Sequence, residues 1–232
     1  MTTVLLVRHG RTTANTSGVL AGWTEGVGLD DTGRGQVTSL AERLAEVPIT
    51  AVVTSPLQRC QETAAALVAD RVDLPVHVDD ALGEVRYGDW TGQSLKTLAK
   101  DPLWKVVQGH PSAAVFPGDG GEGLAAMQAR AVASVRRWND ELGDDAVYVA
   151  VSHGDVIKAV LADALGTHLD QFQRIVVDPA SLSVVTYTST RPFVVRVNDV
   201  GGSVAALRPK PRSRRRRRSS DAAVGGGAGE GA

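Results

Sequence analysis

Five side chains of this sequence are of types that often take part directly in chemistry. His9 and His153 each precede a glycine, Arg8 and Arg59 carry guanidinium groups, and Glu84 supplies a carboxyl. A phosphate monoester needs cations and N–H donors around its oxygens, an in-line nucleophile, and a proton for the departing oxygen. Guanidinium forks match phosphate oxygens, and a neutral imidazole beside them is a nucleophile near pH 7. The five residue types therefore favour phosphoryl transfer, with Glu84 as the expected proton donor.

Two similar stretches must position the histidines. Residues 4–7 and 147–151 are apolar runs rich in β-branched residues, which is typical of fully buried strands. His9 and His153 follow these runs, and ligands of open α/β sheets bind at the carboxyl ends of the strands. We therefore expect both imidazoles to face one pocket. The alternative is that both are ordinary residues at strand ends.

The remaining pattern predicts an α/β fold in which strands and helices follow one another. Residues 183–188 and 193–198 resemble two closing strands, antiparallel at the sheet edge. Further predicted strands cover residues 50–54 and 75–78, and predicted helices cover residues 31–44, 95–104, 124–142 and 156–165.

Arg59 is predicted to lie near the beginning of a helix. Ser55 has the character of an N-cap and Pro56 that of a first helical residue. A cation one turn into a helix is locally unfavourable, so we expect an anionic group to compensate Arg59. The alternative is a solvated arginine on an exposed face.

Two loop regions are candidates for substrate contacts. Residues 84–92 mix glycines, aromatics and charges without helical period, which indicates an irregular loop. The Gly/Pro-rich residues 109–123 are predicted to form a mobile lid or specificity insert. Specificity is expected to lie in residues 16–30 and 94–123.

Composition divides the chain of 232 residues into two parts. Residues 1–207 are predicted to form one domain, for which a hydrophobic content of 43% is sufficient. Residues 208–232 hold eight Lys or Arg and two acidic residues, a net charge of +6; the total of −1 leaves −7 for the body. The acidic body argues against nucleic acid as its main partner. The basic, then Gly-rich tail is predicted to be disordered, either binding polyanions weakly or having no partner.

Cysteine usage and hydropathy indicate the compartment. Cys60 is the only cysteine, so no intrachain disulfide can form, and no run is long enough to cross a membrane. No signal-like segment begins the chain, and a cytoplasmic location is expected. Cys60 could have a lowered thiol pKa beside Arg59, but we expect a small residue packed under the helix.

Four motifs together resemble the histidine phosphatase superfamily, the phosphoglycerate mutase-like proteins. They occur in that family's order and cover nearly all of residues 3–200: RHGRTTAN at 8–15, SPLQRCQETA at 55–64, EVRYGDWTG at 84–92 and SHGD at 152–155. The resemblance implies a three-layer α/β/α sandwich with a mostly parallel sheet, and no metal or organic cofactor.

The resemblance also implies a role for each matching residue. His9 would become phosphohistidine, and Glu84 would donate a proton and later activate water. The transferred phosphoryl group would be bound by Arg8, Arg59 and His153, with Thr12, Asn15 and Gly154 lining its pocket.

Within this family, residues 84–92 are similar to the phosphatase branch, and residues 94–123 look shorter than the substrate-capping insert of the glycolytic mutases. We therefore predict a phosphatase acting on a small phosphorylated metabolite, with a cofactor-dependent phosphoglycerate mutase-type enzyme as the alternative. Residues 26–31 depart from the acid-x-Pro-Leu segment of many members, which leaves the substrate-facing loop open.

Other interpretations of the same residues remain. One is a non-catalytic phosphate- or polyanion-binding protein, which the intact set of five residues disfavours. Another is zinc binding by His9, His153 and Asp155, although their spacing matches no metal signature and guanidinium groups repel a cation. The sequence names neither the substrate nor the oligomeric state, and a homo-oligomer is allowed.

Overall fold

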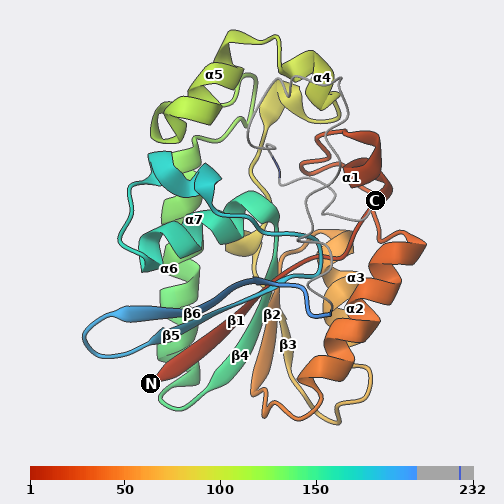
Figure 1. Cartoon of the computed structure of the whole chain (residues 1–232), viewed down its shortest axis with the longest axis vertical. Coiled ribbons are helices and arrows are strands. Elements are labelled where there is room, and N and C mark those ends of the chain that lie inside the picture. The colour runs from red at the N-terminus through yellow and green to blue at the C-terminus, as the bar shows by residue number, and fades with distance from the viewer. Residues whose placement is uncertain (203–224, 226–232) are drawn as a thin grey trace.

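A six-stranded sheet organises the chain. The computed structural model describes residues 1–202 and Gly225, and the sheet order is β3-β2-β4-β1-β5-β6 (Figure 1). The strands are β1 (Thr2–Arg8), β2 (Ala51–Thr54), β3 (Val76–Val78), β4 (Val147–Ser152), β5 (Leu182–Tyr187) and β6 (Pro192–Asp199).

Strand pairing brings the two His-Gly stretches together. β1 and β4 are parallel neighbours, and their register pairs Arg8 with Ser152 at the carboxyl ends. The next residue after each strand is His9 or His153, so both histidines leave the sheet at the same edge. β3, β2, β4 and β1 run parallel, whereas β5 and β6 are antiparallel, as predicted for the closing strands.

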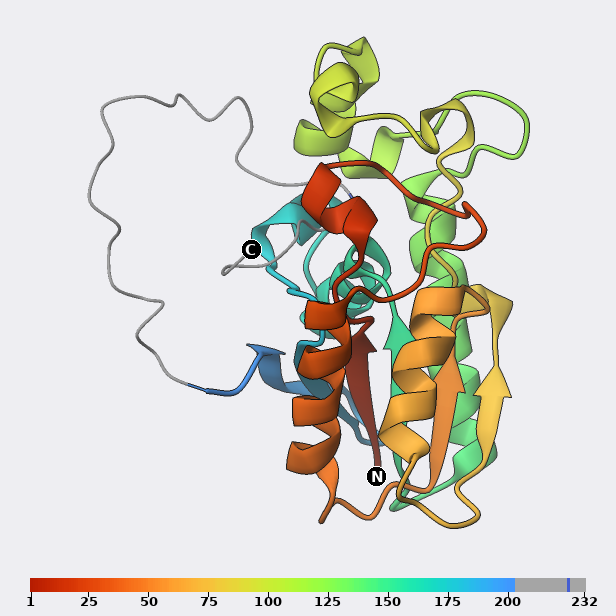
Figure 2. The same ribbon diagram turned by 90° about the vertical axis from the view of Figure 1, so that its right-hand side faces the viewer.

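Helices cover both faces of the sheet, which confirms the three-layer α/β/α sandwich (Figure 2). The α helices are α1 (Thr13–Ser17), α2 (Asp31–Leu44), α3 (Gln58–Val68), α4 (Leu95–Leu98), α5 (Pro102–Gly109), α6 (Leu124–Leu142) and α7 (Gly154–Ala164). One apolar cluster lies between the sheet and α2 and α3, and the other between the sheet and α6 and α7. The helices α1, α4 and α5 lie beyond the carboxyl edge of the sheet (Figure 1).

The predicted N-cap at Ser55 is wrong. α3 begins at Gln58 after Leu57, which makes no side-chain cap, so Arg59 is the second helical residue. Ser55 Oγ instead lies 2.8 Å from His153 Nε2. Ser55 Oγ also accepts from the Leu57 N–H at 3.3 Å, so its hydroxyl joins the turn before α3 to the neighbouring strand end and does not cap the helix.

Residues 95–123 also differ from the prediction. The expected single helix over residues 95–104 is two helices, because the chain turns after α4 and Asp101 caps α5 by accepting from the Leu103 N–H at 2.8 Å. Residues 109–123 do not line the pocket described below. Phe116 is buried and packs edge-on against Tyr87 and Trp90, which ties this segment to the core.

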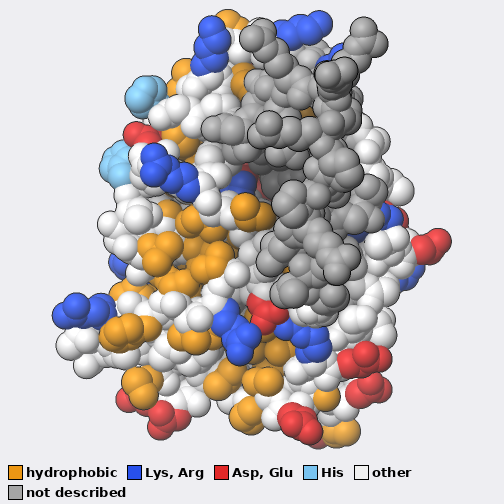
Figure 3. All heavy atoms as spheres, viewed as in Figure 1, with side chains coloured by type: hydrophobic (Ala, Val, Ile, Leu, Met, Phe, Trp, Pro, Cys, Tyr) orange, Lys and Arg blue, Asp and Glu red, His pale blue; other side chains and the backbone are white. Residues whose placement is uncertain are grey.

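Residues 203–224 and 226–232 lie outside the described residues. The predicted disorder of the tail, residues 208–232, concerns this part of the chain apart from Gly225. Among the residues that are described, no helix is long and apolar enough to span a membrane. On the face seen in Figure 3, hydrophobic side chains gather near the middle, and most charged side chains lie around them. Exposed apolar side chains of the edge strand β6 are Phe193, Val195 and Val197.

Candidate active site

The two histidines lie side by side at the carboxyl edge of the sheet. Their ring centroids are 5.3 Å apart, and the His9 N–H donates to the Ser152 carbonyl at 3.0 Å. Both side chains are almost fully buried. The two imidazoles, separated by most of the chain in sequence, therefore lie close together as predicted, although His9 and not His153 lines the pocket described below.

The hydrogen bond of His9 fixes which ring nitrogen is free. Nδ1 lies 2.7 Å from the Gly10 carbonyl oxygen, and because a carbonyl can only accept, Nδ1 carries the proton. Nε2 therefore keeps its lone pair. Burial, followed by the Arg59 and Arg8 guanidinium groups, lowers the pKa of His9 well below its usual value. The ring is thus neutral and able to act as a nucleophile at neutral pH.

Two buried guanidinium groups stand beside this ring. Arg8 donates through Nη1 to the Val177 carbonyl at 2.8 Å, while its buried Nε has no hydrogen-bond partner among the described residues. Arg59 donates through Nη2 to the Gly22 carbonyl at 2.9 Å and lies 3.2 Å from His153 Nδ1. Arg59 is buried, so the alternative of a solvated arginine is wrong. Buried cations with unused donors suit an anion.

His153 is oriented from both sides. Because Arg59 can only donate, His153 Nδ1 accepts, and Nε2 donates to Ser55 Oγ at 2.8 Å. Burial, followed by Arg59 and His9, lowers the pKa of His153 well below its usual value. Ser55, which the sequence predicted to be a helix N-cap, thus orients the His153 ring.

The Glu84 side chain is buried, and hydrogen bonds fix both its backbone carbonyl and its carboxyl group. The Glu84 carbonyl accepts from Trp23 Nε1 at 2.7 Å and from Arg130 Nη2 at 3.0 Å, and the Val85 N–H donates to Glu84 Oε1 at 3.0 Å. Burial and the nearby Asp155 carboxylate raise the pKa of Glu84 to about 7. A carboxyl that gains and loses its proton near neutral pH is suited to general acid and general base catalysis.

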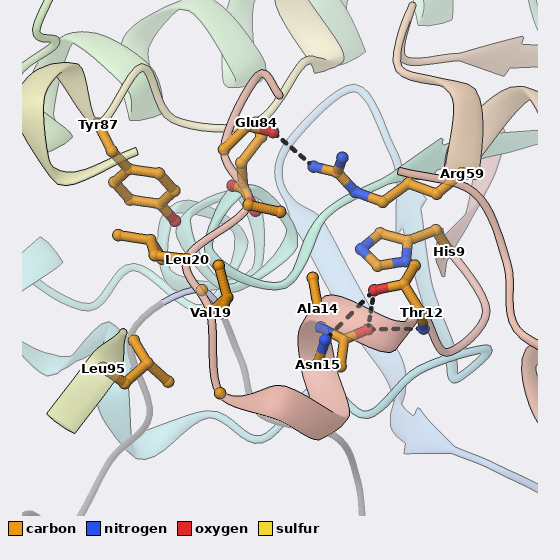
Figure 4. A pocket seen from close by; sticks show the side chains of 14 residues that line it. His9, Thr12, Ala14, Asn15, Val19, Leu20, Arg59, Glu84, Tyr87 and Leu95 are labelled. Atoms are coloured by element: carbon orange, nitrogen blue, oxygen red, sulfur yellow. Dashed lines mark hydrogen bonds between the residues drawn. The ribbon is translucent and has the colours of Figure 1, made fainter. Parts of the chain in front are cut away.

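The other predicted residues lie around this centre. Thr12 caps α1, and its N–H and hydroxyl both donate to Asn15 Oδ1 at 3.0 Å. Both residues line the pocket in front of His9 (Figure 4). Gly154 is the buried first residue of α7. Arg8 and His153 are also buried, and none of these three residues lines the pocket.

Several pocket residues had no predicted role. Gly225 also lines the pocket, with its N–H donating to Asp155 Oδ2 at 2.9 Å and its carbonyl 3.4 Å from Arg8 Nη2. The remaining lining residues to which no individual role was assigned are Ala14, Gly18, Val19, Leu20, Ala21, Gly22, Tyr87 and Leu95. Apart from Ala14, they fall in the segments expected to contact the substrate, which are residues 16–30, 84–92 and 94–123.

Metal and thiol chemistry receive no support here. Within residues 1–202 and Gly225, no group of three His, Cys, Asp or Glu side chains is arranged to hold a metal ion, so the zinc interpretation has no ligand set in the described residues. Cys60 is buried, and burial raises the pKa of its thiol to about 12. The expectation of a small packed residue is confirmed.

The fold and the site define a class of α/β proteins with two buried histidines and two buried guanidinium groups at the carboxyl edge of a mostly parallel sheet. The chain belongs to the histidine phosphatase superfamily, branch 1, whose family model matches residues 4–200. This confirms the resemblance that the four motifs carried.

Relatives include both phosphatases and a mutase. A glucosyl-3-phosphoglycerate phosphatase from Mycolicibacterium vanbaalenii is 32% identical over 177 residues, covering 73% of this chain and 76% of that protein. A 2,3-bisphosphoglycerate-dependent phosphoglycerate mutase from Gloeobacter violaceus is 30% identical over 185 residues, covering 77% and 82%. Among solved structures, Bacillus stearothermophilus YhfR has a TM-score of 0.78 and 26% identity, covering 87% of this chain and 98% of that chain.

Proposed function

We propose that this protein is a phosphatase that hydrolyses small-molecule phosphate monoesters through a phosphohistidine on His9. The observation that carries the proposal is the free Nε2 lone pair of a neutral His9 beside two buried guanidinium groups and a protonatable carboxyl. Relatives named as phosphatases support the same activity.

In the first step, His9 Nε2 attacks phosphorus in line with the ester oxygen. The N–P bond forms as the P–O ester bond breaks, and the Glu84 carboxyl transfers its proton to the departing alcohol oxygen. Arg8 and Arg59 hold the non-bridging oxygens, where charge is concentrated during the transfer.

In the second step, Glu84 acts as a base. Its carboxylate takes a proton from water, the water oxygen attacks phosphorus, and the N–P bond breaks to release inorganic phosphate and regenerate neutral His9. His153 binds beside the same phosphoryl group, with its Nδ1 accepting from Arg59 and so orienting that guanidinium. Thr12, Asn15 and Gly154 complete the surroundings of the phosphate.

The test is phosphate release from a panel of phosphorylated metabolites, run from acidic to neutral pH. We expect turnover by the unaltered protein, none by His9→Ala, and no loss on adding a chelator. Full activity of His9→Ala, or activity lost to a chelator and restored by metal, would overturn the proposal.

A mutase is the second candidate because a phosphoglycerate mutase is among the relatives. Incubation with 3-phosphoglycerate and a trace of 2,3-bisphosphoglycerate separates the two. The proposed phosphatase releases phosphate steadily without forming the isomer, whereas isomer formation without net phosphate release identifies a mutase.

The setting of this activity is also part of the proposal. A single buried Cys60 is consistent with the reducing cytoplasm. The substrate is a small phosphorylated metabolite, and the basic tail adds weak binding to polyanions through charge alone.

A further inference from the structure

The pocket in front of His9 has two chemically different halves. Figure 4 shows His9, Arg59 and Thr12 on one side, and the apolar side chains of Val19, Leu20 and Leu95 on the other. Tyr87 lies on the apolar side, with its hydroxyl directed to Asp155 at 3.3 Å. Phosphoryl chemistry belongs to the polar side, so the alcohol part of a substrate would meet the apolar side.

The apolar side is a fixed wall, because two loops hydrogen-bond to each other behind it. The Leu20 N–H donates to the Gln93 carbonyl at 2.9 Å, and the Gly92 N–H donates to the Leu20 carbonyl at 2.8 Å. The Leu95 N–H donates to the Gly18 carbonyl at 2.8 Å. Leu20 is buried, at 3% exposed, and Val19 and Leu95 are partly exposed beside it, so these two present most of the apolar side. The wall therefore does not depend on a single mobile side chain.

Charged groups are scarce around this wall. In the part of the chain that the structure describes, Arg59 and Glu84 are the charged side chains that line the pocket. Two cations next to lining residues in the sequence do not line the pocket and have other partners: Arg11 pairs with Asp30 at 2.9 Å, and the Arg86 guanidinium lies over the Trp23 ring at 3.9 Å. A second anionic group of a substrate would thus meet apolar surface without a described cation to pair with, which is costly.

We infer that the site selects phosphate monoesters whose alcohol part is uncharged and partly apolar over monoesters that carry a carboxylate or a second phosphate. The inference rests on the proposed function and names its substrate class. The two halves of the pocket supply the selection: cations for one dianionic group, and the wall of Val19, Leu20 and Leu95 for the remainder.

The test compares two nearly isosteric substrates with the full-length protein at low ionic strength. 4-Carbamoylphenyl phosphate and 4-carboxyphenyl phosphate differ by one charge at the far end of the ring. We expect kcat/KM to be at least about tenfold higher for the carbamoyl compound, since tenfold corresponds to a modest cost of placing an unpaired charge on apolar surface.

The two substrates also differ in intrinsic reactivity. Comparing the ratio of their kcat/KM values between variants and the unaltered protein cancels that difference. Leu95→Arg and, independently, Val19→Arg should each lower the ratio by about tenfold by offering the carboxylate a partner. The matched control is Val72→Arg, which adds the same charge at a side chain that is 90% exposed and outside the pocket lining; it should leave the ratio unchanged.

The outcomes distinguish a failure of this inference from a failure of the proposed phosphatase function. Equal or faster turnover of the carboxylated substrate by the unaltered protein overturns the inference but leaves the phosphatase function intact. The inference is also overturned if Leu95→Arg and Val19→Arg give the same ratio of kcat/KM values as Val72→Arg. Hydrolysis of neither substrate, or undiminished hydrolysis by His9→Ala, overturns the proposed function itself.

Discussion

The Glu84 carboxyl can serve as acid and base because its surroundings oppose its ionisation. Burial and Asp155 raise its pKa to about 7, while the Arg8 and Arg59 guanidinium groups act in the opposite direction. The proton is therefore available near neutral pH, where a surface glutamate would already have lost it. Two predictions at the scale of single residues follow from this balance.

The first prediction concerns the leaving group. Glu84→Gln should lower kcat/KM for an alkyl phosphate by about 10²–10⁴-fold, the usual worth of general acid help. For 4-nitrophenyl phosphate the loss should be much smaller, because nitrophenolate departs without a proton. Steady-state kinetics on both substrates provide the measurement. Equal losses on the two would show that Glu84 does not protonate the leaving oxygen.

The second prediction concerns pH. With an alkyl phosphate, activity should fall as pH rises through about 7, because Glu84 then loses the proton it donates. Neutral His9 should impose no loss as pH falls through 6.5, since the pKa of His9 lies well below that value. A pH profile of kcat/KM measures both the expected fall on the alkaline side and the expected absence of a fall at pH 6.5. An alkaline limb that persists unchanged in Glu84→Gln would contradict the assignment.

At the scale of elements, the N-terminal part of α2 packs directly against the loop that carries His9. A Cβ built on Gly33 would lie 2.1 Å from the Arg11 carbonyl oxygen, and one on Gly10 would lie 2.7 Å from the Gly33 carbonyl oxygen. Glycine at these two positions lets the helix and the loop approach closely. The position of His9 thus depends on α2 as well as on β1.

Gly33→Ala should therefore destabilise the protein by about 1–3 kcal/mol and lower kcat, since the loop must move away from α2. Gly35→Ala in the same helix is the matched control, because Gly35 is exposed and a Cβ added to it would meet no atom within 4 Å among the described residues. It should instead stabilise by about 0.4–1 kcal/mol. Urea denaturation and kinetics check both, and similar behaviour of the two variants would refute the close-packing argument.

Elements with a strong hydrophobic period were predictable from the sequence. α6 has the predicted bounds, Leu124–Leu142, and the two His-Gly strands lie where their buried runs indicated. The actual contact of Ser55 was not predictable, because its hydroxyl bonds to His153, which is distant in sequence. The segments that hold Val19, Leu20 and Leu95 were expected to set specificity, but their meeting in one wall was not predictable, since short apolar segments carry no sign of which distant loop they will meet.

At the scale of the whole molecule, charge divides the chain into a body with a net charge of −7 and a tail with +6. We propose on this basis that the two parts have different partners. The body is suited to small anions held in a pocket, whereas five consecutive arginines are suited to long polyanions.

A protein ending at Leu207 should bind DNA more weakly than the full-length protein, and the difference should shrink with added salt as counterion release predicts. The same truncation removes Gly225 from the pocket lining, but it should not lower kcat/KM, because the proposed catalytic groups all lie within residues 1–207. Fluorescence titration and phosphate release measure the two effects. Equal DNA binding by both proteins would dismiss a role for the tail.

The central claim, that the phosphoryl group passes through His9 Nε2, can be tested by trapping the intermediate. Brief incubation with a ³²P-labelled monoester, quenching in base and peptide mapping should place an acid-labile, base-stable label on His9, with none in His9→Ala. Label on another residue, or rapid turnover without any label under conditions that trap phosphohistidine, would contradict the account.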